Sequence, residues 1–139
     1  MIDVPIPKSG EVLVKCIAAP INPSDLGFLK GYYSEHGLYE IEYPSVPGWE
    51  GAGIVVHNGG GLLGWGIMGK RVAFVRRLHN ETEMRYGGCY QQYVVANALE
   101  CIPLPNSIPL DIGSMHFVNP ITAIGLVERI TNNKAQAAV

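Results

Sequence analysis

The sequence lacks the features of several large protein classes. Its 10 lysines and arginines against 12 aspartates and glutamates give a net charge of −2, so it offers no basic surface to nucleic acid or to an anionic membrane. The three cysteines form no C-x-x-C pair, which argues against a disulfide framework and a four-thiolate zinc site. No apolar run reaches the roughly 18 residues that cross a bilayer, and Asp3, Lys8 and Glu11 stand where a signal peptide would be apolar. We therefore expect an intracellular protein, cytoplasmic or mitochondrial, with neither nucleic acid nor a membrane as partner.

Charge is scarce, while apolar and turn-forming residues are plentiful. Charged residues make up 16% of the 139 residues and hydrophobic residues 47%, a balance that can bury a core and that differs from disordered chains. This length fits a single domain. The 17 glycines and 10 prolines interrupt the chain too often for a helical bundle. The composition therefore favours one domain made mainly of β structure.

Five segments have the pattern of short strands. In the first, apolar residues recur at every second position from Val12 to Ala18, which is the period of a half-buried strand. Glycines and prolines separate the segments, and such regular short strands predict a barrel or a sandwich. The predicted strands are residues 11–19, 51–57, 70–76, 89–96 and 99–104.

A short helix and a long loop are expected between the first two strands. Ser24 and Asp25 can cap a helical turn that runs to Leu29 and ends at Gly31. Residues 31–48 hold glycines, prolines and tyrosines with no sustained period, so we expect a long loop there.

The clearest helix comes last in the chain. Asn119 at the N-cap and Pro120 at the first helical position open it, and a shorter helix around residues 111–117 precedes it. The apolar side of this last helix is formed by Ile121, Ile124, Leu126, Val127 and Ile130. A helix with such a side needs a packing partner.

A glycine-rich segment imitates a dinucleotide-binding fingerprint. Residues 59–64 read G-G-G-L-L-G, which matches G-x-G-x-x-G after a predicted strand. The fingerprint requires a helix that opens directly after the glycines, so that its N–H groups face the pyrophosphate. Trp65, Gly66 and Gly69 follow instead, and a strand is expected from Lys70. We therefore interpret the segment as an ordinary connection between strands.

Six short motifs occur in a fixed order along the chain. They are I-N-P-S-D at 21–25, G-Y-Y at 31–33, P-G-W-E-G-A-G-I-V at 47–55, G-K-R-V at 69–72, G-G-C-Y-Q-Q-Y-V-V at 87–95 and N-P-I-T-A at 119–123. This succession resembles the N-terminal, GroES-like catalytic domain of the medium-chain dehydrogenase/reductase superfamily, and most of all its zinc-independent quinone oxidoreductases and enoyl thioester reductases. The resemblance covers nearly the whole chain. It implies a mainly β fold, a GroES-like partly open β-barrel with one or two short helices and a C-terminal helix.

The resemblance also implies that the protein holds no metal. Zinc-dependent members carry a histidine ligand where Trp49 stands and a cysteine ligand where Asn22 stands. Catalytic zinc needs three protein ligands, and an indole and a carboxamide do not supply them. The four cysteines of the structural zinc lobe are missing as well. The histidines are scattered without ligand spacing, at His36, His57, His79 and His116.

For function, the resemblance implies a hydride transfer. The complete enzyme would use NADPH, or NADH, to reduce a small-molecule substrate, namely a quinone, an enone or an enoyl thioester. Residues 1–118 would form the substrate-side domain, shortened at its N-terminus, and residues 119–139 a linking helix and the start of a missing Rossmann domain. The chain would then be inactive alone, the apolar side of its last helix partly exposed, and the full-length form a homodimer. The alternative is a non-catalytic remnant that serves as an interaction or structural subunit.

Three residues are candidates for the site on the same basis. Tyr33 matches the tyrosine that enoyl thioester reductases place after their N-P-S-D segment and glycine. Its phenol would donate a hydrogen bond or a proton to the group that receives charge, or else it only packs the loop. Asn22 would orient the substrate or the nicotinamide amide, or else cap the following helical turn. Thr122 lies one turn into the last helix, where its hydroxyl would be near the nicotinamide end of the cofactor.

Overall fold

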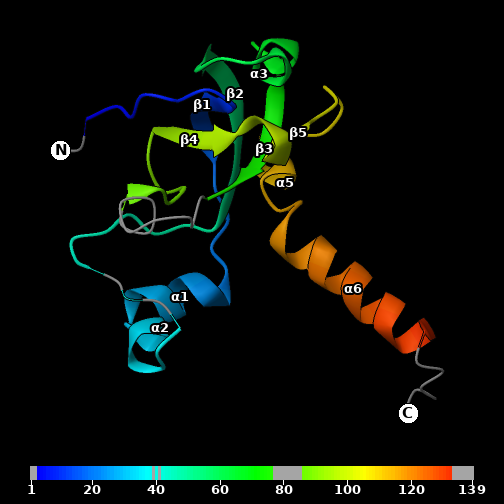
Figure 1. Ribbon diagram of the computed structural model, residues 1–139. Coiled ribbons are helices and arrows are strands. Elements are labelled where there is room, and N and C mark those ends of the chain that lie inside the picture. The colour runs from blue at the N-terminus through cyan, green and yellow to red at the C-terminus, as the bar shows by residue number, and fades with distance from the viewer. Residues whose placement is uncertain (1–2, 39, 41, 77–85, 133–139) are drawn as a thin grey trace.

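A five-stranded antiparallel sheet is the centre of the structure (Figure 1). The computed structural model describes residues 3–38, 40, 42–76 and 86–132. The strand order is β4-β1-β2-β3-β5, so β4 and β5 are the edges and the described sheet is not a closed barrel. The strands are β1 (Glu11–Ala18), β2 (Glu50–Asn58), β3 (Arg71–Val75), β4 (Tyr93–Asn97) and β5 (Ile102–Pro103). The helices in the described residues are α1 (Pro23–Leu29), α2 (Tyr32–Glu35), α3 (Leu62–Ile67), α5 (Leu110–Gly113), α6 (Val118–Asn132) and the 3-10 helix η1 (Ala98–Glu100). The mainly β, partly open fold expected from the sequence is confirmed.

The hydrophobic core lies on the sheet. Val12 and Val14 of β1, Val72 and Phe74 of β3, and Val94 of β4 are completely buried and belong to one cluster. Burying each such side chain stabilises the fold by about 1.5–3 kcal/mol relative to leaving it in water. The first three predicted strands are confirmed to within one or two residues at their ends.

The last two predicted strands are shorter than expected. β4 begins at Tyr93 and not at Cys89, whose amide donates to the Gly48 carbonyl at 3.0 Å and therefore lies outside the β1–β4 ladder. The fifth predicted strand starts as η1, because the Asn97 side chain accepts a hydrogen bond from the Leu99 amide at 3.0 Å. Only the two residues of β5 then remain to pair with β3.

Two helices occupy the region between β1 and β2. α1 begins earlier than predicted, since its N-cap is Asn22 and not Ser24 or Asp25. Asn22 and Asp25 form a capping box, in which the Asn22 amide donates to Asp25 Oδ2 at 2.7 Å. The segment expected to be a loop holds α2, closed by a 3.0 Å hydrogen bond from the Glu35 amide to the Gly31 carbonyl. The loop prediction failed because four helical residues are too few to show a period.

The glycine-rich connection also contains a helix, so the prediction of none was wrong. Gly61, with a φ of +104°, is the N-cap of α3, in a backbone conformation that favours glycine. The Asn58 side chain holds the turn, accepting from the Gly60 amide at 3.0 Å and donating to the Gly61 carbonyl at 3.2 Å. However, β2 and β3 on either side of α3 are antiparallel neighbours, whereas the dinucleotide fingerprint belongs to a helix that connects parallel strands. The segment is therefore no fingerprint, for a topological reason.

The last two helices start and end differently from the sequence expectation. α5 ends at Gly113, before the predicted end at residue 117. α6 begins at Val118, so Asn119 lies in its first turn and is not its N-cap, and Pro120 is its third residue. Proline is still tolerated there, because the first turn has no intrahelical partners for its N–H groups.

α6 extends away from the sheet (Figure 1). Its five apolar residues named above are each more than half exposed, which confirms the expected exposure of this side. No described helix is long and apolar enough to span a membrane. The predicted domain boundary at residue 119 falls in the first turn of α6. Residues 133–139, expected to begin a second domain, lie outside the described residues.

Gly53 of β2 has no room for a side chain against β1. A Cβ on Gly53 would lie 2.1 Å from the Lys15 carbonyl oxygen, whereas a Cβ on Gly125 of α6 would meet nothing within 4 Å. Gly53→Ala should therefore lower the free energy of unfolding by about 1–3 kcal/mol. Gly125→Ala should leave it unchanged or raise it by up to about 1 kcal/mol. Urea unfolding of both variants tests this, and equal stabilities would contradict it.

The exposed side of α6 predicts self-association of the chain. A continuous apolar helix face in water favours contacts between copies. The apparent Tm and the sedimentation coefficient should therefore rise with protein concentration. A sharp thermal transition of a clean monomer, independent of concentration, would contradict this.

Candidate functional site

A buried glutamate joins three distant segments of the chain. Glu50, at the start of β2, is 0% exposed. Its Oε1 accepts a hydrogen bond from Asn22 Nδ2 at 3.1 Å. Its Oε2 accepts from the Phe117 amide at 3.0 Å and the Val118 amide at 2.9 Å. The N-cap of α1 and the first residue of α6 thus meet at one carboxylate.

These hydrogen bonds explain why α6 begins at Val118. The first N–H groups of a helix have no partner within the helix, and the helix dipole makes this end favourable for a negative charge. Glu50 accepts from the first of these groups, the Val118 amide, and from the amide of the preceding residue, Phe117. A cap supplied by β2 therefore replaces the local cap that the sequence suggested at Asn119.

Asn22 lies inside this network. It is only 4% exposed, and its Oδ1 accepts a hydrogen bond from Asn119 Nδ2 at 3.3 Å. Its expected capping of α1 is confirmed by the capping box with Asp25. Its role in orienting a substrate or a nicotinamide amide stays a prediction.

Aromatic rings line the neighbouring part of the site. The ring centroid of Trp49 lies 6.1 Å from Phe28 and 5.8 Å from Tyr33, both edge to face. Tyr33, on α2, is half-buried, and its ring also faces Gly27 of α1, where an added Cβ would lie 3.5 Å from it. The sequence-predicted Tyr33 is thereby held against the residue that precedes Glu50. Its role as a donor stays a prediction.

A buried cation lies behind these rings. Arg76 is 4% exposed, and its guanidinium carbon lies 4.8 Å from the Phe28 centroid and 5.1 Å from the Trp49 centroid. Burial lowers the pKa of the Arg76 guanidinium, an effect that the negative charge of Asp25 opposes. Arginine nonetheless stays protonated at neutral pH. The guanidinium therefore stabilises the ring faces by cation–π attraction.

The thiols of the chain are protonated at neutral pH. Burial raises the pKa of Cys16 to about 11 and that of Cys101 to about 12, and it raises the pKa of Cys89 well above its usual range. The reactive form of cysteine is the thiolate. Nucleophilic cysteine chemistry is therefore unsuited to this site.

Thr122 lies on the exposed surface of α6. Its hydroxyl donates to the Val118 carbonyl at 2.6 Å, so it is tied to the turn that Glu50 caps. Its position near a nicotinamide stays a prediction.

The side chains at the zinc-ligand positions do not fit a zinc ion. Asn22 directs its Nδ2 to Glu50, and Trp49 offers an indole N–H with no lone pair for a metal. No group of three or more metal-ligating side chains occurs among the described residues. His79 lies outside those residues.

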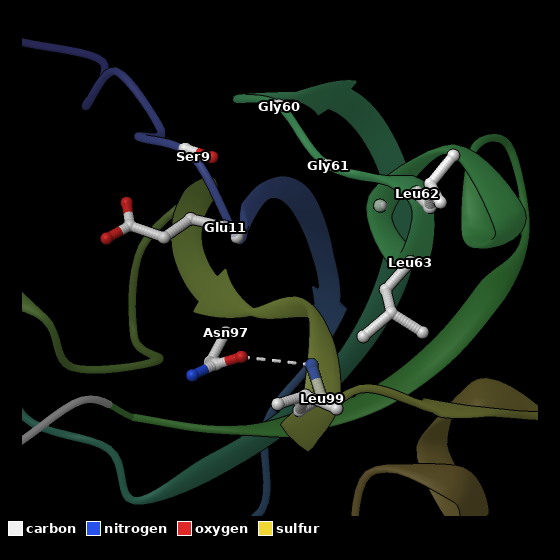
Figure 2. A pocket seen from close by; sticks show the side chains of 10 residues that line it. Ser9, Glu11, Gly60, Gly61, Leu62, Leu63, Asn97 and Leu99 are labelled. Atoms are coloured by element: carbon white, nitrogen blue, oxygen red, sulfur yellow. Dashed lines mark hydrogen bonds between the residues drawn. The ribbon is translucent and has the colours of Figure 1, made fainter.

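A separate cavity of about 430 Å³ lies beside α3 (Figure 2). Its lining includes Leu62 and Leu63 of α3, Leu99 of η1 and Glu11 of β1 (Figure 2). None of the candidate residues lines it, and α3 lies at the end of the sheet away from α1 and α2 (Figure 1). The cavity is therefore not part of the site around Glu50.

Sequence reasoning missed the two residues that hold the site together. The sequence patterns contain Glu50 only as a letter of the P-G-W-E-G-A-G-I-V motif at 47–55, and Arg76 only as the last residue of the strand expected at 70–76. The available signal was a charged residue directly beside the apolar run of a strand, Gly51–Val56 for Glu50 and Val72–Val75 for Arg76. Such a residue is seldom fully buried unless it is paired.

The amino-acid sequence is similar to a known domain family and to several curated proteins. The model of the family described as alcohol dehydrogenase GroES-like domain matches residues 8–106. The mitochondrial enoyl-acyl-carrier-protein reductase of Caenorhabditis elegans is 31% identical over 132 residues, 94% of this chain and 34% of that protein. The Bos taurus protein of the same name is 35% identical over 118 residues, 81% of this chain and 27% of that protein. The chain thus spans about a third of the length of these curated relatives.

Solved structures give the same picture of the fold. A candidate NADPH:quinone reductase from Mesorhizobium loti matches with a TM-score of 0.76 and 33% identity, covering 94% of this chain and 35% of that one. The Escherichia coli quinone oxidoreductase complexed with NADPH shares the fold at a TM-score of 0.69 and 24% identity, covering 93% and 35%. Each match covers more than nine tenths of this chain.

Proposed function

The chain belongs to the alcohol dehydrogenase GroES-like domain family, and from this membership we propose that it is the substrate-side domain of a zinc-independent, NADPH-dependent oxidoreductase. Its relatives are enoyl reductases and quinone oxidoreductases of the medium-chain dehydrogenase/reductase superfamily. The substrate would be a quinone, an enone or an enoyl thioester. The observation that carries the proposal is the convergence of Asn22, Tyr33 and the start of α6 around Trp49 and Glu50.

The cofactor would be NADPH, with NADH as the alternative, and it would supply the hydride. The names of two matched structures support NADPH. In this chain, Thr122 would lie near the nicotinamide. Its hydroxyl, now bonded to the Val118 carbonyl, retains lone pairs that can accept a hydrogen bond.

Tyr33 would act on the substrate atom that receives negative charge. A phenol can donate a hydrogen bond to a developing oxyanion, or a proton late in the reaction. The edge-to-face contact with Trp49 restricts the ring, and α1 supports it at Gly27. The Asn22 carboxamide, held by its hydrogen bond to Glu50, would orient the substrate or the nicotinamide amide. The aromatic rings would exclude water from the reacting carbonyl and strengthen these interactions.

The exposed apolar side of α6 supports a contact with a dinucleotide-binding domain. Residues 1–118 would be the substrate side, and residues 119–139 would link the two domains. The complete enzyme would be an intracellular homodimer, in the cytoplasm or in mitochondria. The chain alone would be inactive, because most cofactor contacts would come from the other domain.

A second candidate function is that of a non-catalytic interaction or structural subunit. The same exposed side of α6 favours it, since a helix face of this kind can dock on another protein. The two functions differ in whether turnover appears when a dinucleotide-binding domain is supplied.

Cofactor titration tests the proposal directly. The chain alone is expected to bind NADPH only weakly and to show no NADPH oxidation with a small enone or quinone. Adding a dinucleotide-binding domain, in trans or fused after α6, should produce turnover. Micromolar binding with turnover by the chain alone would refute the assignment of cofactor contacts to a second domain, and no turnover in either form would favour the interaction subunit.

Tyr33→Phe tests the proposed donor. In the form that turns over, the loss of the hydroxyl should lower kcat by about 10²-fold or more, as the loss of a general acid does. Tyr32→Phe is the matched control, because Tyr32 is half exposed and stacks on His36 at 4.0 Å. Unchanged turnover in Tyr33→Phe would mean that Tyr33 only packs the loop.

A further inference from the structure

Glu50 is the residue at which the separate parts of the site meet. We infer that it is a positioning residue, whose buried carboxylate fixes the Asn22 carboxamide and the first turn of α6 relative to each other. The catalytic consequence of this inference rests on the proposed function, whereas its geometric part does not.

The carboxylate is placed to hold its neighbours and not to touch a substrate. Glu50 is 0% exposed, and both of its oxygens accept hydrogen bonds from the protein. A side chain that lies wholly inside the fold acts on chemistry only through the groups that it holds. Those groups are the Asn22 carboxamide and the amides of Phe117 and Val118.

The Glu50 carboxylate also decides which way Asn22 faces. A carboxylate only accepts hydrogen bonds, so the carboxamide turns its Nδ2 toward Oε1 of Glu50. Asn22 Oδ1 is then directed to Asn119 Nδ2. The reversed carboxamide would set two acceptors against each other at Glu50 and two donors at Asn119. One orientation is therefore strongly favoured.

The same carboxylate determines the position of α6. Its Oε2 holds the amides of Phe117 and Val118 at 3.0 and 2.9 Å. Thr122 belongs to the next turn, where its hydroxyl is bonded to the Val118 carbonyl. A change at Glu50 therefore displaces the Asn22 side chain and the Thr122 turn together.

Amide hydrogen exchange of the chain tests the geometric part without any activity. In Glu50→Gln, an NH2 group replaces one of the two carboxylate oxygens. It then faces N–H donors that have an oxygen acceptor in the unchanged protein. The Phe117 and Val118 amides should then exchange at least about tenfold faster, the scale of a hydrogen bond to a charged acceptor. The Val55 amide, bonded to the Lys70 carbonyl at 3.0 Å in the sheet, should keep its rate.

Glu128→Gln is the matched control. Glu128 is an exposed carboxylate on α6, so its removal changes the charge by the same amount and should leave exchange at Phe117 and Val118 unaltered. Unchanged exchange at these two amides in Glu50→Gln overturns the inference, as does equal acceleration in Glu128→Gln.

Asn22→Ser decides the question if Glu50→Gln does not fold. Serine remains a good N-cap for α1, while the Nδ2 donor to Glu50 is lost. Without the hydrogen bond from Asn22 Nδ2, the Glu50 carboxylate is less restrained. The exchange rates of the Phe117 and Val118 amides should then change by roughly threefold or more, because groups that share one hydrogen-bond network are energetically coupled. No change there overturns the coupling.

Turnover tests the catalytic part, with NADPH and a small enone or quinone as probes and a dinucleotide-binding domain present. Glu50→Gln should lower kcat by on the order of tenfold or more and leave KM within about threefold, because the reacting groups are misplaced while binding persists. Glu50→Asp, which keeps the charge on a shorter side chain, should recover part of the loss. Full activity in Glu50→Gln overturns the catalytic part. Absence of turnover in the unchanged protein counts against the proposed function, and the exchange result then decides the geometric inference alone.

Discussion

The need to satisfy one buried carboxylate organises this end of the domain. Removing an ionised carboxylate from water costs several kcal/mol unless protein donors replace the lost hydrogen bonds. Glu50 obtains its donors from Asn22, 28 residues away in sequence, and from Phe117 and Val118, 67 and 68 residues away. The same requirement therefore fixes where α1 and α6 begin relative to the sheet.

Trp49, the residue before Glu50, is the centre of the neighbouring aromatic cluster. Trp49 lies between Phe28 and Tyr33, and the Arg76 guanidinium covers both Phe28 and Trp49. Since Trp49 and Glu50 are adjacent at the start of β2, the ring cluster and the polar network share one piece of backbone. Tyr33 and α6 are thus both placed by the segment that opens β2.

Local sequence patterns predicted the features that a short window contains. The period of two located β1, the six ordered motifs identified the family that the comparisons confirm, and the apolar side of α6 is exposed as expected. The one-turn α2 and the six-residue α3 were missed because they are too short to show a period. The start of α6 was misplaced for a different reason. Asn119 and Pro120 look like a local cap, but Glu50 supplies the cap from a strand far away in sequence, which no local pattern contains.

Asn22 shows why capping and a role in the site are compatible. The sequence presented these as alternatives, yet the residue serves both. In the α1 cap, the Asn22 main-chain amide donates to Asp25 Oδ2, and the carboxamide also bridges Glu50 and Asn119. A residue chosen only as a cap could be serine or aspartate. The bridge between an acceptor-only carboxylate and a donor on α6 requires both a donor and an acceptor. An ionised aspartate has no donor and serine has both functions on one oxygen, whereas asparagine places them on two separate atoms, Nδ2 and Oδ1.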